Sequence, residues 1–165
     1  MDLGGAAEEW YIWIGLAIAS FAIAGIALAI PTTPPPDVHA AANTIDDIAA
    51  SEYNATGEYD HDADFYWVDG RRIAMKNSGG ISRESLRFGV ATPVQGYPKL
   101  KKLLYGTPPT EVFDSDQSDP RELKTLAQQA RDSVDSDDPT WIKADEKLHV
   151  RTVVWGDVHV TLVEM

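Results

Sequence analysis

The densest cluster of side chains that could do chemistry is the segment 60–64, Asp-His-Asp-Ala-Asp. Carboxylates beside an imidazole are able to hold a hard or borderline cation. An EF-hand loop also needs a glycine at its middle, and this segment has none. The alternative is a solvated acidic loop, which the aspartate-rich composition favours. We therefore predict no metal site and no cofactor.

A second group of candidate residues lies near the C-terminus. A hairpin that turns at Gly156-Asp157 would place His149 opposite Glu164, with Arg151 on the same face. No nucleophile accompanies them, so we interpret this group as structural ion pairing. The chain has no cysteine and no Gly-x-Ser-x-Gly, Gly-x-x-x-x-Gly-Lys or His-Glu-x-x-His motif. We therefore predict that the protein is not an enzyme.

Basic residues are concentrated in one block of the sequence. Residues 70–102 contain eight bases and one acid, whereas residues 37–69 contain nine acids and no base. The block suits an anionic solute, a glycan or lipid headgroups; alternatively it neutralises the acidic segment of its own chain or of a neighbour. The net charge of −12 argues against a nucleic-acid partner. The candidate residues for an anionic partner are Arg71, Arg72, Lys76, Arg83, Arg87, Lys99, Lys101 and Lys102.

The run of residues 10–30 contains no charged side chain. As a helix it would be roughly 31 Å long, the thickness of a hydrocarbon core. We therefore predict a transmembrane helix over 10–30, a short tail over 1–9, and a single-pass protein of the cell membrane with its C-terminal domain outside. Small residues at three- and four-residue spacing would let another helix approach within the membrane. These residues are Gly15, Ala19, Ala22, Gly25 and Ala29.

The remaining sequence predicts a linker followed by one folded domain. Residues 31–36 are rich in proline and predict an extended linker. An extracytoplasmic domain is expected over 37–165, beginning with a stalk helix over 37–53 that Asp37 caps. The apolar stripe of that helix packs either on its own domain or on neighbouring subunits. Asn54-Ala55-Thr56 is a glycosylation sequon, and it makes Asn54 a candidate modification site.

The fold class predicted for the domain is α+β. Residues 65–68 and 71–76, joined by Asp69-Gly70, indicate a hairpin, and residues 81–88 indicate a third strand. Residues 148–155 and 158–164 indicate the C-terminal hairpin. Helical spacing over 98–105 and a capped start at Asp119-Pro120 indicate two more helices. We expect one small antiparallel sheet of four or five strands with two or three helices.

The chain as a whole resembles the single-pass membrane proteins of haloarchaea, several families of which accompany type IV pilus and archaellum-like machines. Its acidic composition with little lysine is typical of extreme halophiles; an acidic mesophile domain with a flexible acidic stalk is the alternative. Pilin-like subunits begin with a short leader before an apolar helix, and cleavage after Gly4 would make Glu9 the fifth mature residue, the position of the pilin glutamate. The leader lacks a basic residue, and the prolines interrupt the helix. Both departures oppose entry into a filament.

Two functional hypotheses follow from these patterns. The leading one is a non-enzymatic, membrane-anchored external domain that serves a cell-surface assembly, such as a type IV pilus-like system, with other membrane or pilus-like assembly proteins as its partners. The alternative is a membrane-anchored binding module for an anionic solute or polysaccharide, which would use the basic block.

Overall fold

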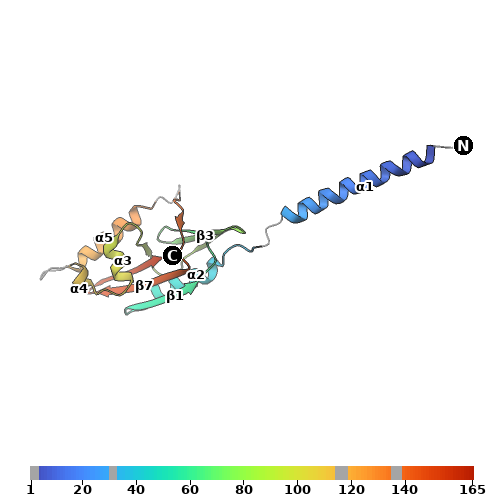
Figure 1. The fold of residues 1–165 in the computed structure, drawn as a ribbon. Helices are drawn as coiled ribbons and strands as arrows, with labels where there is room; N and C mark the ends of the chain where they lie inside the picture. The colour runs from blue at the N-terminus through green and yellow to red at the C-terminus, as the bar shows by residue number, and fades with distance from the viewer. Residues whose placement is uncertain (1–3, 30–32, 114–118, 135–138) are drawn as a thin grey trace. The chain divides into compact units, whose positions relative to one another are not determined.

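The computed structural model describes residues 4–29, 33–113, 119–134 and 139–165. The chain divides into two compact units, Met1–Pro34 and Pro35–Met165. Figure 1 labels their helices and strands along the chain. The first unit consists of one helix, and the second contains all the strands and the other helices.

The helix of the first unit is α1, Gly4–Ala29. Its described apolar side chains are exposed: Trp10 is 66% exposed and Phe21 is 79% exposed. A Cβ atom added at Gly15 or at Gly25 would meet no other atom of the first unit within 4 Å, apart from the neighbouring helix backbone. The described apolar surface of α1 therefore has no cover within the first unit.

The prediction of a transmembrane helix is contradicted by the structure. In the ranges that the structure describes, no helix combines the length and the apolar character that crossing a membrane requires. The prediction of a single-pass membrane protein with its C-terminal domain outside depended on this helix, and it is therefore not supported either.

The second unit contains two four-stranded sheets instead of the single sheet that we predicted. Sheet A has the strand order β1-β7-β8-β5, and sheet B has the order β4-β3-β2-β6. The strands are β1 Ala55–Asp60, β2 Phe65–Val68, β3 Arg72–Asn77, β4 Gly80–Ser85, β5 Ala91–Pro93, β6 Ile142–Lys143, β7 Lys147–Trp155 and β8 Val158–Glu164. All neighbouring strands are antiparallel except β5 and β8, which are parallel. The two hairpins lie in different sheets, so each needs additional strands at its edges.

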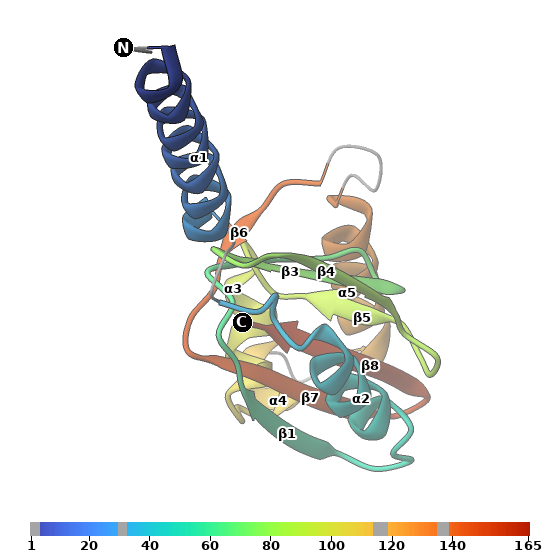
Figure 2. The ribbon, with the colours of Figure 1, turned by 90° about the vertical axis from the view of Figure 1, so that its right-hand side faces the viewer.

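The layers follow from the side-chain alternation of the β7–β8 hairpin. Val150 and Val163 belong to a core shared with α2 (Val38–Ala49) and the inner face of sheet B. Val153 and Leu162 belong to a second core shared with α3, α4 and α5. These helices are Pro98–Leu104, Pro109–Val112 and Pro120–Asp132. Sheet A is therefore the middle layer, with helices on one face and α2 with sheet B on the other (Figure 2).

The register of the C-terminal hairpin agrees with the prediction. Trp155 pairs with Val158, and His149 pairs with Glu164. The predicted hairpin of β2 and β3 also forms, with Val68 opposite Ile73. The turn between the strands is centred on Gly70 and Arg71, one residue later than the predicted Asp69-Gly70. The backbone N–H of Asp69 donates to the carbonyl oxygen of Arg72 and closes this turn.

The predicted helix starts are present as well. The carboxylate of Asp37 accepts a hydrogen bond from the backbone N–H of Ala40 at 3.0 Å, and Asp119 caps α5 through the N–H of Arg121 at 2.9 Å. The apolar stripe of α2 packs within its own domain, where Ile45 is fully buried. α2 also approaches β1 closely, since a side chain at Gly57 would lie 2.8 Å from Ile48.

A core substitution tests this packing. Ile45→Ala removes three methylene equivalents from the core between α2 and the sheets, and we expect it to lower the free energy of unfolding by about 2–5 kcal/mol. Ile81→Ala is the matched control, because Ile81 is 43% exposed; we expect a loss below about 1 kcal/mol there. Urea unfolding of the full chain, followed by near-ultraviolet circular dichroism, measures both. Equal losses would contradict the assignment of α2 to the core.

Candidate functional site

The basic block of the sequence is divided in space. Arg71 to Arg87 lie on sheet B and the segments next to it, whereas Lys99 to Lys102 lie on α3. The ammonium group of Lys101 binds the buried carboxylate of Glu164 at 2.7 Å, and Lys99 lies over the ring of Phe113 at 5.1 Å. The structure therefore does not gather these cations into one surface.

A cleft of about 710 Å³ brings Arg71 and Arg72 together with a third arginine, Arg131, which the sequence reading did not select. We call it the arginine cleft. Its walls come from the β2–β3 turn, α5, β8, the end of α2 and the segment after β4. The lining residues are Ala49, Asp69, Arg71, Arg72, Gly89, Val90, Gln128, Arg131, Asp132, His159 and Thr161.

The β2–β3 turn positions two of these arginines. The Asp69 carboxylate accepts hydrogen bonds from the backbone N–H groups of Arg71 at 3.2 Å and Arg72 at 2.8 Å. It also accepts one from Nε of Arg72 at 2.7 Å, so the charge of Arg72 is compensated. Gly70 has a φ of 90°, a conformation that glycine adopts without strain. The turn thus holds Arg71 at the cleft with an exposed side chain.

α5 supplies the third arginine. Nη1 of Arg131 donates to Oγ1 of Thr92 at 2.7 Å, and Nη2 donates to Oε1 of Gln128 at 2.9 Å. Burial lowers the pKa of Arg131 from its ordinary value, while the carboxylate of Asp132 raises it. A guanidinium remains protonated near neutral pH all the same. Arg131 is therefore a half-buried cation whose direct hydrogen-bond partners are neutral.

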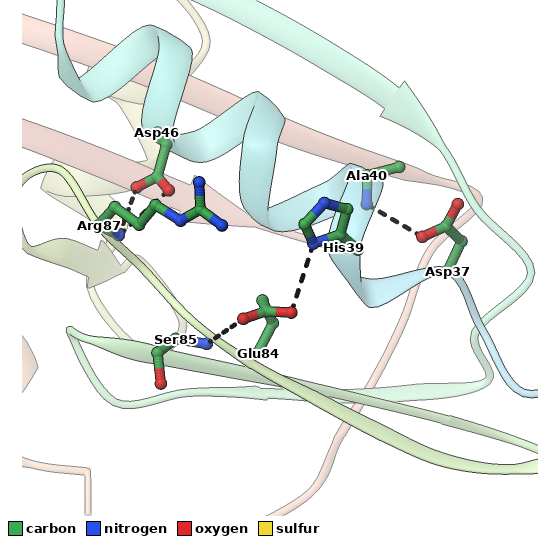
Figure 3. A network of polar contacts seen from close by, with 7 residues as sticks. All are labelled: Asp37, His39, Ala40, Asp46, Glu84, Ser85 and Arg87. Carbon is green, nitrogen blue, oxygen red and sulfur yellow. Dashed lines mark hydrogen bonds and ion pairs between the residues drawn. The ribbon is translucent and has the colours of Figure 1, made fainter.

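The segment after β4 closes the cleft, and α2 holds that segment in place. The buried carboxylate of Asp46 accepts hydrogen bonds from the backbone N–H of Arg87 at 3.0 Å (Figure 3) and from that of Phe88 at 2.9 Å. Nearby, Nδ1 of His39 lies 3.4 Å from the carboxylate of Glu84 (Figure 3). Because buried hydrogen bonds to a carboxylate are among the stronger ones, Asp46 fixes the wall formed by Gly89 and Val90.

The chemistry available in the cleft is anion binding. Within the described part of the chain, neither Arg71 nor Arg131 forms an ion pair with a carboxylate. Guanidinium groups present fixed forks of donors that match carboxylate and phosphate oxygens. The sequence pattern did not identify Arg131, because this residue is 60 positions from Arg71 in the chain and lies on an amphipathic helix. The only signal was its place in the last turn of α5, on the side of the buried Ala127 and Ala130.

The acidic segment 60–64 forms part of a separate depression of about 570 Å³ with Lys143, Asp145 and Glu146. Nδ1 of His61 accepts a hydrogen bond from the backbone N–H of Ala63 at 3.2 Å, and its Nε2 is buried with no hydrogen-bond partner among the described residues. Asp62 binds the side-chain amide of Asn77 at 3.1 Å. Among the described residues, no three histidine or carboxylate side chains are grouped as a metal ion requires.

The predicted ion pair between His149 and Glu164 does not form. Although the two residues are opposite each other, Nδ1 of His149 lies 3.5 Å from the carboxylate of Glu58 instead. The Glu164 carboxylate is occupied by Lys101 and by the hydroxyl of Tyr105, which donates to it at 2.9 Å. Arg151 does not reach it either. These partners come from α3 and its end, so strand register alone could not reveal them.

The sequon residue Asn54 lies between α2 and β1 with an exposed side chain. Its amide oxygen accepts a hydrogen bond from the backbone N–H of Val154 at 2.7 Å. A glycan attaches to the amide nitrogen, which this hydrogen bond leaves free. The position is therefore compatible with the predicted modification, which stays a prediction.

The half-buried imidazole of His61 predicts a dependence of stability on pH. Burial lowers the pKa of His61 below its ordinary value of 6.5 more strongly than Asp62 and Asp60 raise it. Below about pH 6.5 the unfolded chain therefore binds more protons than the folded chain, and the free energy of unfolding rises with pH across this window. We expect His61→Gln to flatten the rise measured by urea unfolding between pH 5 and 7.5. The exposed His159→Gln should leave it unchanged, and a steep slope in both variants would contradict the assignment.

Comparison with known proteins places the chain in a family. No curated protein and no solved structure matches it significantly. One family model, described as a family of unknown function (DUF7283), matches residues 5–153, which include α1, the arginine cleft up to Asp132 and most of β7. Since this match covers most of the sequence, the chain belongs to the DUF7283 family.

Proposed function

We propose that the chain is a non-enzymatic binding protein, whose domain over residues 35–165 holds an anionic group of a solute or polysaccharide in the arginine cleft. The observation that carries this proposal is the pair Arg71 and Arg131. These two guanidinium groups form no ion pair within the described chain, although Asp69 and Asp132 line the same cleft. Such a pair is unexpected in a chain with a net charge of −12, where carboxylates are abundant.

Burial makes the Arg131 charge important. A cation that is removed from water without an opposite charge loses solvation energy, and a bound anion restores part of it. The neutral partners Thr92 and Gln128 hold the guanidinium plane in a fixed orientation. Since less side-chain freedom is then lost on binding, the cleft is preorganised for a carboxylate, sulfate or phosphate group.

Binding of simple anions tests the proposal. We expect citrate and inorganic phosphate to bind the full chain in isothermal titration calorimetry, and the double substitution Arg71→Gln with Arg131→Gln to weaken binding at least 10-fold. The loss of two charge-assisted hydrogen-bond donors justifies that size. Arg121→Gln is the matched control on the same helix, because the Arg121 side chain is 86% exposed. Equal affinity in the double variant, or no binding by the original chain, would overturn the proposal.

A second function is favoured by α1. A helix that is apolar on all sides needs cover, and the exposed tryptophans and isoleucines of α1 have none within their own unit. We propose that α1 is covered by helices of other subunits in a multi-chain assembly, of which pilus-like systems are the model. The open space at Gly15 and Gly25 would let a helix approach along the small-residue stripe.

Bulky residues on that stripe test the assembly proposal. A Cβ atom at Gly15 or Gly25 meets no other side chain of the first unit within 4 Å. For Gly15→Leu with Gly25→Leu we therefore expect the domain to fold normally, while high-mass complexes from cross-linked cells decrease several-fold on native gels. Phe21→Leu is the control, since it keeps an apolar side chain at a position that is already large. Unchanged complexes in the glycine variant would contradict a helix contact at the stripe.

A further inference from the structure

The outer face of sheet B is exposed at Phe65, Lys76, Ile81 and Lys143, whereas Trp67 and Ala74 on the same face are buried. Tyr66, Val68, Ile73 and Met75 point into the core that sheet B shares with α2 and sheet A. Because successive side chains alternate, their neighbours along β2 and β3 point the other way. Directly opposed residues share a face, so Lys143, Phe65, Lys76 and Ile81 form one row across the four strands.

This face carries positive charge in an acidic protein. Four cations lie on it, and each has an exposed side chain: Arg72, Lys76, Arg83 and Lys143. Only Arg72 is compensated, by Asp69 at the edge; the other three form no ion pair within the described chain. We call these four residues, with the exposed Phe65 and Ile81 between them, the basic face.

Exposed apolar groups lie among the cations. Phe65 is 40% exposed and Ile81 is 43% exposed. An apolar centre surrounded by charged side chains is the usual composition of a protein contact surface, in which the apolar groups lose water and the charges set the orientation.

The complementary surface is on the same chain. Asp62, Asp64, Asp145 and Glu146 surround the depression at the β1–β2 and β6–β7 connections, and all four are exposed. We call them the acidic rim. No carboxylate of the rim forms an ion pair within the described residues. The three uncompensated cations of the basic face are opposite in sign to the four carboxylates of the rim.

We propose that the basic face of one copy binds the acidic rim of a second copy of this chain. The net charge of −12 opposes most approaches between two copies. The basic face is a surface at which an acidic copy meets attraction instead, and the rim supplies the carboxylates. This proposal does not depend on the arginine cleft or on α1.

The size of the face sets the strength of this contact. Four strands spaced about 4.8 Å apart, with about five residues each at 3.3 Å, give roughly 300 Å², whereas a stable interface buries about 800 Å² per partner. The contact is therefore weak for two free copies. It becomes effective where copies are already held together, since tethering raises the local concentration. Chemical cross-linking in a concentrated sample is accordingly a better test than sedimentation of a dilute one.

Carbodiimide cross-linking of the full chain tests the contact directly, because the reagent joins a lysine amine to a carboxylate that touches it. Copies labelled with ¹⁴N and ¹⁵N are mixed, so that mass spectrometry separates links between copies from links within one copy. We expect links between copies from Lys76 or Lys143 to the rim. Links found only within a chain, including links to Asp135, Asp137 or Asp138, would overturn the proposal.

Charge reversal supplies the control on specificity. Lys76→Glu with Lys143→Glu reverses the face, and Asp64→Lys with Glu146→Lys reverses the rim; we expect each variant alone to lose at least 90% of the face–rim links. Mixing the two variants should restore links between them, because the reversed face then meets the reversed rim. Arg121→Glu with Lys124→Glu on α5 reverses two exposed cations elsewhere and should change nothing. Failure of the mixture to restore the links counts against the proposal.

Discussion

The structure of the domain depends on one hairpin, β7 and β8, that is buried on both faces. Its residues alternate between two cores, so that Val150 and Val163 contact α2 and sheet B while Val153 and Leu162 contact the helices. A shift of the register by one residue would turn the side chains of one strand to the opposite face. The residues of that strand that now pack against α2 and sheet B would then face the helices α3, α4 and α5, and the reverse. The two-residue turn at Gly156-Asp157 fixes the register, with Gly156 at a φ of 61°. Every other layer is placed by its contact with one face of this hairpin.

Polar groups inside the layers are matched to this arrangement. Thr152 on β7 binds the carbonyl oxygen of Ile48 at 2.8 Å, which ties the end of α2 to the hairpin. Glu164 on the opposite face binds Lys101 and Tyr105, which ties α3 to it. Burial and the hydrogen bond to Glu164 raise the pKa of Tyr105 to about 12, so its hydroxyl stays a donor at neutral pH. Each face thus carries one polar tie to the layer above it.

The sequence predicted the elements with strong local signals. Two-residue turns and β-branched alternation identified both hairpins, and capping aspartates identified the starts of α2 and α5. It did not predict β1, β5 or β6. β5 and β6 have only three and two residues, and β1 contains Gly57 and no β-branched apolar residue, so no period could be recognised. Without these edge strands the chain seemed to form one sheet. The arginine cleft escaped prediction for a related reason, because its residues come from five elements that only the tertiary fold brings together.

The fold also determines where the basic residues of the sequence lie, which their number and order along the chain could not predict. The basic block was expected to act as a unit or to neutralise the acidic segment 37–69. Instead the alternation of side chains along the strands divides the basic block between two surfaces. Lys76 and Arg83 lie on the outer face of sheet B, and Arg71 lines the arginine cleft. Arg72 lies between the two surfaces, over the ring of Trp67 at 5.3 Å and bound to Asp69. Because Asp69 compensates this one cation, the cleft and the basic face are separated by a neutral pair. An anion at Arg71 and Arg131 is therefore bound by cations that the outer face does not share.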